Sequence, residues 1–175
     1  FKDINDTMGH AAGDTLIMAV AERLRRTLAP EDFFARFGGD EFAVLRRAGD
    51  ANAVEDLAER LRKGFEDTFD IYGQHIRMTA SVGIAMAPEH GFSPQELMRH
   101  ADIALYQGKN QGRDRAMVFC AEMAAEVEQR REVEVELQAA LDAGELYLHY
   151  QPVISCAQNR ISGVEALLRW SHPTK

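Results

Sequence analysis

Apolar residues recur at helical spacing early in the chain, and this pattern predicts a helix over residues 14–28. Gly13 precedes the helix and Asp14 is its candidate cap, while Pro30 marks its end. The same spacing predicts further helices over residues 51–66 and from Ser93 to Leu105, where the Ser-Pro pair is typical of a helix start. The apolar face of the first helix consists of Leu16, Ile17, Val20, Leu24 and Leu28.

Strand-like runs alternate with these helices. Residues 32–37 and 42–45 flank a double glycine, which predicts a β-hairpin. Residues 75–87 predict one long strand with small residues in its middle, and residues 115–119 predict a short one. The order helix, hairpin, helix, strand, helix, strand predicts an α/β (α+β) domain in which a sheet of mixed strand directions is flanked by helices.

The composition changes at Ala121, where Glu, Arg, Val, Leu and Ala begin to dominate. A charged helix is therefore predicted over residues 121–143, ending at Gly144. Two more strand-like runs follow at 146–154 and 161–169. We expect the helix to link a domain over residues 1–120 to the beginning of another over residues 145–175.

The bulk properties exclude some functions. The chain has 175 residues and a formal net charge of −8, so no general basic field attracts nucleic acid. No apolar run approaches the roughly 20 residues that span a membrane, and no signal peptide is present. Cys120 and Cys156 have neither metal-ligand spacing nor a disulfide framework, which favours a cytoplasmic protein. Both ends resemble the interior of a longer protein.

The candidate chemistry centres on residues 38–42, Gly-Gly-Asp-Glu-Phe, in the predicted hairpin turn. The glycines allow positive φ and let a ligand approach the backbone. The adjacent carboxylates of Asp40 and Glu41 are the oxygen ligands that Mg²⁺ takes, usually shared with substrate phosphates. Taken alone, the same residues also fit a solvated acidic turn.

Spaced motifs on both sides of the turn favour the first interpretation. With Gly38–Phe42, they resemble the GGDEF family of diguanylate cyclases over residues 1 to about 120, and several motifs in the right order are far more specific than one. The motif residues are Phe1, Lys2, Asn5, Asp6, Gly9, His10, Gly13, Asp14, Val82, Gly83, Ile84, Ala85, Ala101, Asp102, Ala104, Tyr106, Lys109, Gly112 and Arg113.

This resemblance implies a GGDEF-type nucleotidyl-cyclase sheet and the condensation of two GTP molecules into cyclic di-GMP. Asp40 matches a ligand of Mg²⁺ (or Mn²⁺), and Glu41 matches the second acid, which also activates the attacking 3′-hydroxyl. Asn5 and Asp14 match positions that bind the guanine edge. Gly38 and Gly39 bring the backbone close to the nucleotide. The matches to phosphate contacts are Lys2, Lys109 and Arg113. Catalysis in this family needs two facing domains, which implies a homodimer.

The sequence departs from the family in two places. The family carries a metal-binding aspartate on a strand just before the Phe1-Lys2 motif, and this chain begins after it. We expect the missing strand to lower activity. The run 146–153, from the same or a neighbouring chain, is a candidate to fill its place. The product-binding Arg-x-x-Asp motif retains Asp32 but has Ala29 instead of arginine, so we expect no product inhibition through this degenerate site.

The C-terminal residues resemble the opening of the EAL family of cyclic di-GMP phosphodiesterases. Residues 150–153 and 163–173 carry this resemblance. It implies that Glu165 matches a metal-binding glutamate and that Gln151 and Arg169 match substrate contacts. The family's further acidic ligands lie downstream, so this piece is expected to be inactive alone and to indicate a tandem GGDEF–EAL parent.

Two other functions remain open. The first domain fits a GTP-binding regulatory module that controls the attached EAL domain without performing chemistry, although retention of Asp40 and Glu41 favours catalysis. The helix over 121–143 also fits a dimerisation element, but Arg130 and Arg131 interrupt its apolar stripe.

Overall fold

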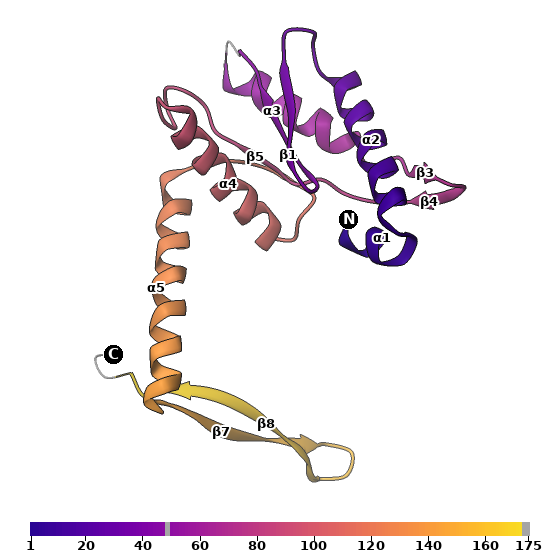
Figure 1. Ribbon diagram of the computed structural model, residues 1–175. Helices are drawn as coiled ribbons and strands as arrows, with labels where there is room; N and C mark the ends of the chain where they lie inside the picture. The colour runs from indigo at the N-terminus through magenta and orange to yellow at the C-terminus, as the bar shows by residue number, and fades with distance from the viewer. Residues whose placement is uncertain (48–49, 173–175) are drawn as a thin grey trace. The chain divides into compact units, whose positions relative to one another are not determined.

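The computed structural model describes residues 1–47 and 50–172, which form two compact units, Phe1–Ala124 and Ala125–Lys175. The first unit contains the helices α1 (Lys2–Met8), α2 (His10–Thr27), α3 (Ala51–Lys63) and α4 (Pro94–Asn110). Its strands are β1 (Phe33–Gly38), β2 (Glu41–Leu45), β3 (Phe69–Ile71), β4 (Gln74–Ile76), β5 (Val82–Ile84) and β6 (Ala116–Val118) (Figure 1). Helix α5 (Ala121–Ala143) starts in the first unit and continues into the second, which also holds β7 (Leu146–Ser155) and β8 (Arg160–Trp170).

The predicted mixture of strand directions is confirmed, but the described strands of the first unit form separate two-stranded sheets and not the one predicted sheet. β1 pairs with β2, and β3 with β4, in antiparallel hairpins, whereas β5 and β6 are parallel. Helix α4 packs against β5 and β6, and it connects them as the crossover that a parallel pair requires. The domain is therefore α/β, with helices packed on short strands.

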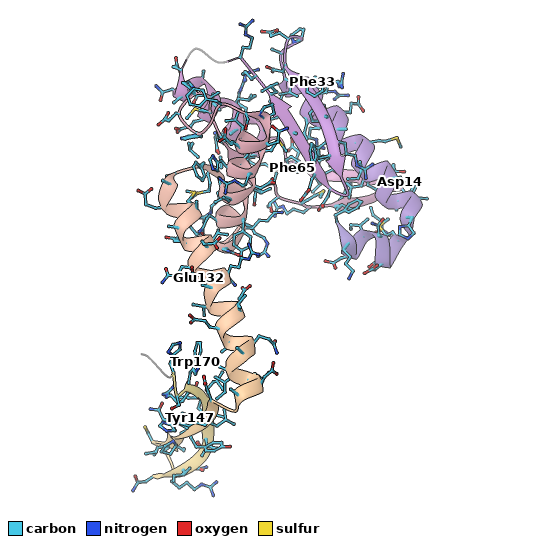
Figure 2. All side chains as sticks on the ribbon, turned by 60° about the vertical axis from the view of Figure 1, so that its left-hand side comes forward. Asp14, Phe33, Phe65, Glu132, Tyr147 and Trp170 are labelled. Atoms are coloured by element: carbon cyan, nitrogen blue, oxygen red, sulfur yellow. The ribbon has the colours of Figure 1, made fainter. Side chains whose placement is uncertain are left out.

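The core of the first unit forms where α2 and α3 meet the hairpins. The buried side chains at its centre are apolar, and Figure 2 shows Phe65 among these elements. From the β1–β2 hairpin, the side chains of Phe34, Phe42 and Val44 pack against this centre. The buried residues of the cluster are Ala12, Leu16, Val20, Leu24, Leu57, Leu61, Phe65, Phe69 and Ile71.

Arg23 on α2 binds the loop between α3 and β3. Its guanidinium donates hydrogen bonds to the carbonyl oxygens of Gly64, Asp67 and Thr68, at 3.1, 2.6 and 3.0 Å. It also lies 3.6 Å from the centroid of the Phe69 ring, a cation–π contact. These contacts bind a loop with no secondary structure of its own to the helical layer.

The predicted start of the first helix is wrong. α2 begins at His10, so Asp14 lies in its second turn and is not its cap. Gly13 is consequently an interior helical residue, and a Cβ at this position would lie 1.9 Å from Oδ1 of Asn5. The close approach of the Asn5 side chain explains why a poor helix former stands here. The short helix α1, which carries Asn5, has no predicted counterpart.

The single strand predicted over residues 75–87 is also wrong. Residues 74–76 form β4, which pairs with β3 in an antiparallel hairpin. In the turn between the two strands, Tyr72 and Gly73 have φ of 54° and 79°. This two-residue turn has the left-handed geometry that suits the twist of a hairpin. After residues 77–81, which belong to no strand, β5 pairs with β6. One apolar run thus serves two separate sheets.

Local signals located the remaining elements well. Ser93 caps α4: its hydroxyl accepts a hydrogen bond from the Glu96 amide, and the Glu96 carboxylate accepts one from the Ser93 amide. Helix α5 has its predicted bounds and ends at Gly144, whose φ is 71°. Residues 146–153, the candidate to replace a strand of the first domain, belong to β7, which pairs with β8 in the second unit.

Candidate active site

The predicted hairpin turn is present and carries the two carboxylates at its tip. Gly38 pairs with Glu41, so Gly39 and Asp40 form the two-residue connection between β1 and β2. Gly39 has a φ of 50°, a conformation that favours glycine. A β-bulge at Phe37 shifts the register just before the turn. Asp40 and Glu41 are both exposed, so both carboxylates are open to a ligand.

Arg36, on the strand leading into the turn, fixes the turn peptide. Its Nε and Nη2 both donate to the carbonyl oxygen of Gly39, at 3.0 and 2.7 Å. The fork geometry of the guanidinium makes this a directional constraint. The Asp40 backbone is therefore held in place although its side chain is exposed. Arg36 was not among the site residues that the sequence predicted.

The predicted guanine-binding residues lie on two helices that pack against each other, Asn5 on α1 and Asp14 on α2. The Asn5 side chain lies against the backbone of Gly13, whose neighbour in the helix is Asp14. Asp14 is exposed on α2 (Figure 2). The pair therefore presents an amide and a carboxylate from adjacent helices, groups that suit the acceptor and donors of a guanine edge.

The three predicted phosphate contacts lie at element ends and are exposed. Lys2 is the first residue of α1, and Lys109 stands in the last turn of α4. Arg113 follows in the connection to β6, where its φ is 60°. Lys109 and Arg113 are thus presented from one helix end, while Lys2 comes from a separate helix.

Asp32, the retained residue of the degenerate inhibitory site, already binds other groups of the chain. Its side chain is 1% exposed and accepts hydrogen bonds from the Arg46 guanidinium, with Nε at 2.7 Å from Oδ1 and Nη2 bonded to Oδ2. The Ala29 amide donates to Oδ2 at 2.7 Å. The Arg46 guanidinium, assisted by this amide, holds the pKa of Asp32 below its ordinary value.

We expect Asp32→Asn to lower the free energy of unfolding by about 2 kcal/mol at neutral pH, because a nearly buried guanidinium loses its charged partner. A carboxyl with a depressed folded pKa stabilises above its unfolded pKa, and this contribution disappears as pH falls through the folded value. The difference in urea unfolding between the parent and the variant should therefore shrink as the pH falls through the lowered folded pKa of Asp32. Glu31→Gln, at an exposed neighbour, is the control, and a pH-independent difference would contradict the assignment.

The second unit places the predicted EAL residues on one face of a two-stranded sheet. Gln151 lies directly opposite Glu165, and Arg169 lies opposite Tyr147. Glu165 and Arg169 are four residues apart on β8, so their side chains share a face. All three candidates are exposed. Apolar residues such as Leu148 and Leu168 occupy the other face.

The described residues contain no group of three or more His, Cys, Asp or Glu side chains placed to bind a metal ion. No helix among them is long and apolar enough to cross a membrane.

The fold and the turn define an α/β domain with an exposed acidic hairpin, and comparison with known proteins identifies its family. The model of the family "Diguanylate cyclase, GGDEF domain" matches residues 1–115, and the model "EAL domain" matches residues 134–175. The chain therefore belongs to the GGDEF family and carries a segment of an EAL domain after it.

Relatives and solved structures agree with this membership. The chain is 41% identical over 173 residues to the bifunctional diguanylate cyclase/cyclic di-GMP phosphodiesterase MucR of Pseudomonas aeruginosa, covering 99% of this chain and 25% of MucR. It is 39% identical over 175 residues to the cyclic di-GMP phosphodiesterase NbdA of the same organism, covering 100% of this chain and 22% of NbdA. The chain thus spans a quarter or less of the length of these relatives.

Among solved structures, the GGDEF domain of TpbB (YfiN) from Pseudomonas aeruginosa has a TM-score of 0.69 and 34% identity. The match covers 73% of this chain and 75% of that one. The predicted fold class is confirmed by this likeness.

Proposed function

We propose that the first domain condenses two GTP molecules into cyclic di-GMP with release of pyrophosphate. The observation that carries this proposal is the β1–β2 turn, which exposes Asp40 and Glu41 side by side while Arg36 holds the Gly39 carbonyl. A rigid backbone with open carboxylates suits phosphoryl transfer, in which positioning and electrostatic stabilisation provide most of the catalysis.

Proteins of this family are metal-dependent, and the turn fits a divalent cation. Asp40 and Glu41 offer carboxylate oxygens, and Mg²⁺ commonly binds through one or two carboxylates while substrate phosphates and water complete its coordination. We propose that these residues hold Mg²⁺ or Mn²⁺. When bound, the ion neutralises charge on the phosphate oxygens.

The other residues bind and orient the substrate. Asn5 and Asp14 recognise the guanine edge, while Lys2, Lys109 and Arg113 bind the phosphates. Glu41 accepts the proton of the attacking 3′-hydroxyl. Gly38 and Gly39 allow the nucleotide close to the backbone, since a Cβ at Gly38 would meet nothing within 4 Å and leaves that side open.

Formation of both phosphodiester bonds requires two GTP molecules that face each other. One site of this kind holds one GTP, so we propose that the active species is a homodimer with two opposed sites. We place the cyclase domain at residues 1–120, the linker at 121–144 and the EAL segment at 145–175. In the whole protein, Gln151, Glu165 and Arg169 would contribute to a cyclic di-GMP site.

The similarity to the phosphodiesterase NbdA favours a second candidate function. NbdA is a phosphodiesterase, yet its match covers 100% of this chain, including the GGDEF region. A domain that binds GTP and regulates the attached EAL domain without chemistry is consistent with that similarity. The two functions differ in whether GTP is consumed.

The deciding experiment incubates the chain with GTP and Mg²⁺ and measures cyclic di-GMP and pyrophosphate by chromatography. We expect one cyclic di-GMP for every two GTP consumed. The contradicting outcome is that GTP binds but is recovered intact, both with this chain and with a longer form of the protein that begins upstream. That result would rule out catalysis and favour the regulatory function.

Gly13→Ala tests the guanine subsite. The added Cβ would lie 1.9 Å from Asn5 Oδ1, a side chain that can swing away, so the variant should remain folded. We expect GTP affinity, measured by calorimetry, to fall about 10-fold through the loss of one or two hydrogen bonds. The free energy of unfolding should stay equal or rise, because alanine favours a helix interior.

Asn5→Ala is the matched variant for this test. It should weaken GTP binding to the same extent, and combining it with Gly13→Ala should add nothing, because both changes remove one contact. Additive losses would contradict a shared mechanism.

The degenerate inhibitory site should not bind product. Arg46 engages both carboxylate oxygens of Asp32, and Ala29 offers no guanidinium. We expect calorimetry to show no submicromolar cyclic di-GMP binding that disappears in Asp32→Asn. Tight binding that depends on Asp32 would mean that the product displaces Arg46.

A further inference from the structure

The connection between α4 and β6 has an unusual backbone. Gly112, Arg113 and Asp114 follow one another with φ of 112°, 60° and 48°. Arginine rarely adopts this left-handed region, because its Cβ crowds the following carbonyl. Such a conformation persists only when surrounding contacts enforce it, and it is common at ligand-binding positions. The contacts that enforce it here come from two directions.

The first set of contacts is local. The Arg113 amide donates to the carbonyl oxygen of Gly108 at 3.0 Å, which folds the connection back on the helix end. Arg115 Nε donates to the Arg113 carbonyl oxygen at 3.2 Å. These bonds hold the backbone of Arg113 but leave Asp114 without a local anchor.

The second contact comes from Arg62 on α3, far away in the sequence. Its Nη1 donates to Oδ1 of Asp114 at 3.0 Å. Its Nε and Nη2 donate to the two oxygens of Glu59, at 2.8 and 2.7 Å. The Arg62 side chain is only 18% exposed, so Glu59 orients a guanidinium that is largely shielded from water. The hydrogen bonds that Arg62 donates to Glu59 and Asp114 raise the pKa of Arg62, which keeps the bridge charged.

The Arg113 side chain is left open by this arrangement. Arg113 is exposed, and within residues 1–47 and 50–172 its guanidinium makes no hydrogen bond or ion pair. The chain therefore holds the backbone of one arginine from both sides and leaves its charged group available to an anion.

We propose that Arg62, oriented by Glu59, is a positioning residue for substrate binding. By anchoring Asp114 it fixes the backbone of Arg113, so that the guanidinium is already placed for the phosphates of GTP. This inference rests on the proposed function, in which Arg113 contacts the triphosphate. A preorganised side chain binds more tightly because less ordering is required when the ligand arrives.

The test separates anchoring from folding. Asp114→Gly removes the carboxylate but suits a positive φ, whereas Asp114→Asn keeps an oxygen acceptor and also tolerates the left-handed region. Binding to the full chain with Mg²⁺ is measured for guanosine 5′-(α,β-methylene)triphosphate, which is not turned over, and for guanosine, which has no phosphate. Urea unfolding of each variant reports its fold.

We expect Asp114→Gly to weaken triphosphate binding about 5-fold, to leave guanosine binding unchanged, and to have no effect when Arg113 is already alanine. Asp114→Asn should bind like the parent. Arg113→Ala should bind the triphosphate more weakly than Asp114→Gly does, because it removes the contact itself.

The outcomes distinguish the positioning role of Arg62 from the phosphate contact of Arg113. If Arg113→Ala weakens binding but Asp114→Gly does not, the positioning role is wrong while the function of Arg113 stands. Equal losses for guanosine and the triphosphate, or losses that add in the double variant, would show a merely structural bridge and also overturn the inference. If Arg113→Ala binds the triphosphate like the parent, the proposed phosphate contact fails, and the positioning role fails with it.

Discussion

Gly83→Ala is expected to destabilise the first unit by about 3 kcal/mol. Gly83 lies in β5, against the face of α4, and a Cβ there would lie 2.0 Å from the carbonyl oxygen of Ala101 and 2.6 Å from the amide nitrogen of Leu105. Both are helix backbone atoms, so one side chain cannot move aside to make room. The whole of α4 must shift away from the β5–β6 pair, which exposes part of the core.

Urea unfolding of the parent and the variant measures this effect. Gly163→Ala on β8 is the control, because a Cβ there would meet nothing within 4 Å. Alanine has a slightly better strand propensity than glycine, so the control should be neutral or mildly stabilising. If Gly83→Ala unfolds at the same urea concentration as the control, α4 does not pack on β5 as closely as the structure shows.

Asp40→Asn is expected to reduce cyclic di-GMP formation by roughly 100-fold or more, since loss of the proposed metal ligand removes several kcal/mol of transition-state stabilisation. The turn itself should persist, because Arg36 binds the carbonyl of Gly39 and not the side chain of Asp40. The variant is therefore expected to unfold at the same urea concentration as the parent while losing its response to the metal.

The measurement compares the rate of product formation, and the gain in GTP affinity that Mg²⁺ provides, between the parent and the variant. Glu31→Gln removes an exposed carboxylate outside the turn and serves as the matched control. An Asp40→Asn variant whose GTP affinity still rises with Mg²⁺ as in the parent would remove Asp40 from the metal site. The role of Glu41 would then need separate examination.

Local chemistry explains where the sequence predicted the structure correctly. The Ser93 cap and its Glu96 partner lie within four residues, so the signal for the start of α4 is contained in one short segment. Gly144 ends α5 because a positive φ suits glycine. The turn at Gly38–Glu41 followed in the same way from a double glycine between apolar runs.

Competition between segments explains the errors. Asp14 has the right residue type for a helix cap, but α1 folds back so that Asn5 covers Gly13, and α2 extends to His10. The apolar run 75–87 has no internal signal for a break, because its division depends on the partners β3 and β6. The pattern of apolar residues in a strand indicates which positions are buried, but it does not indicate which other strand pairs with it.

The sequence by itself determined the family through several spaced motifs, and the α/β class through the order of the predicted elements. It also determined the acidic turn and several helix ends, because each of these depends on residues only a few positions apart. The tertiary structure alone decided which charged groups support the site. Arg46 binds Asp32 across 14 positions, and Arg62 binds Asp114 across 52. No local pattern encodes such pairs, since any arginine in the chain has the same chemistry until folding places one beside a particular carboxylate.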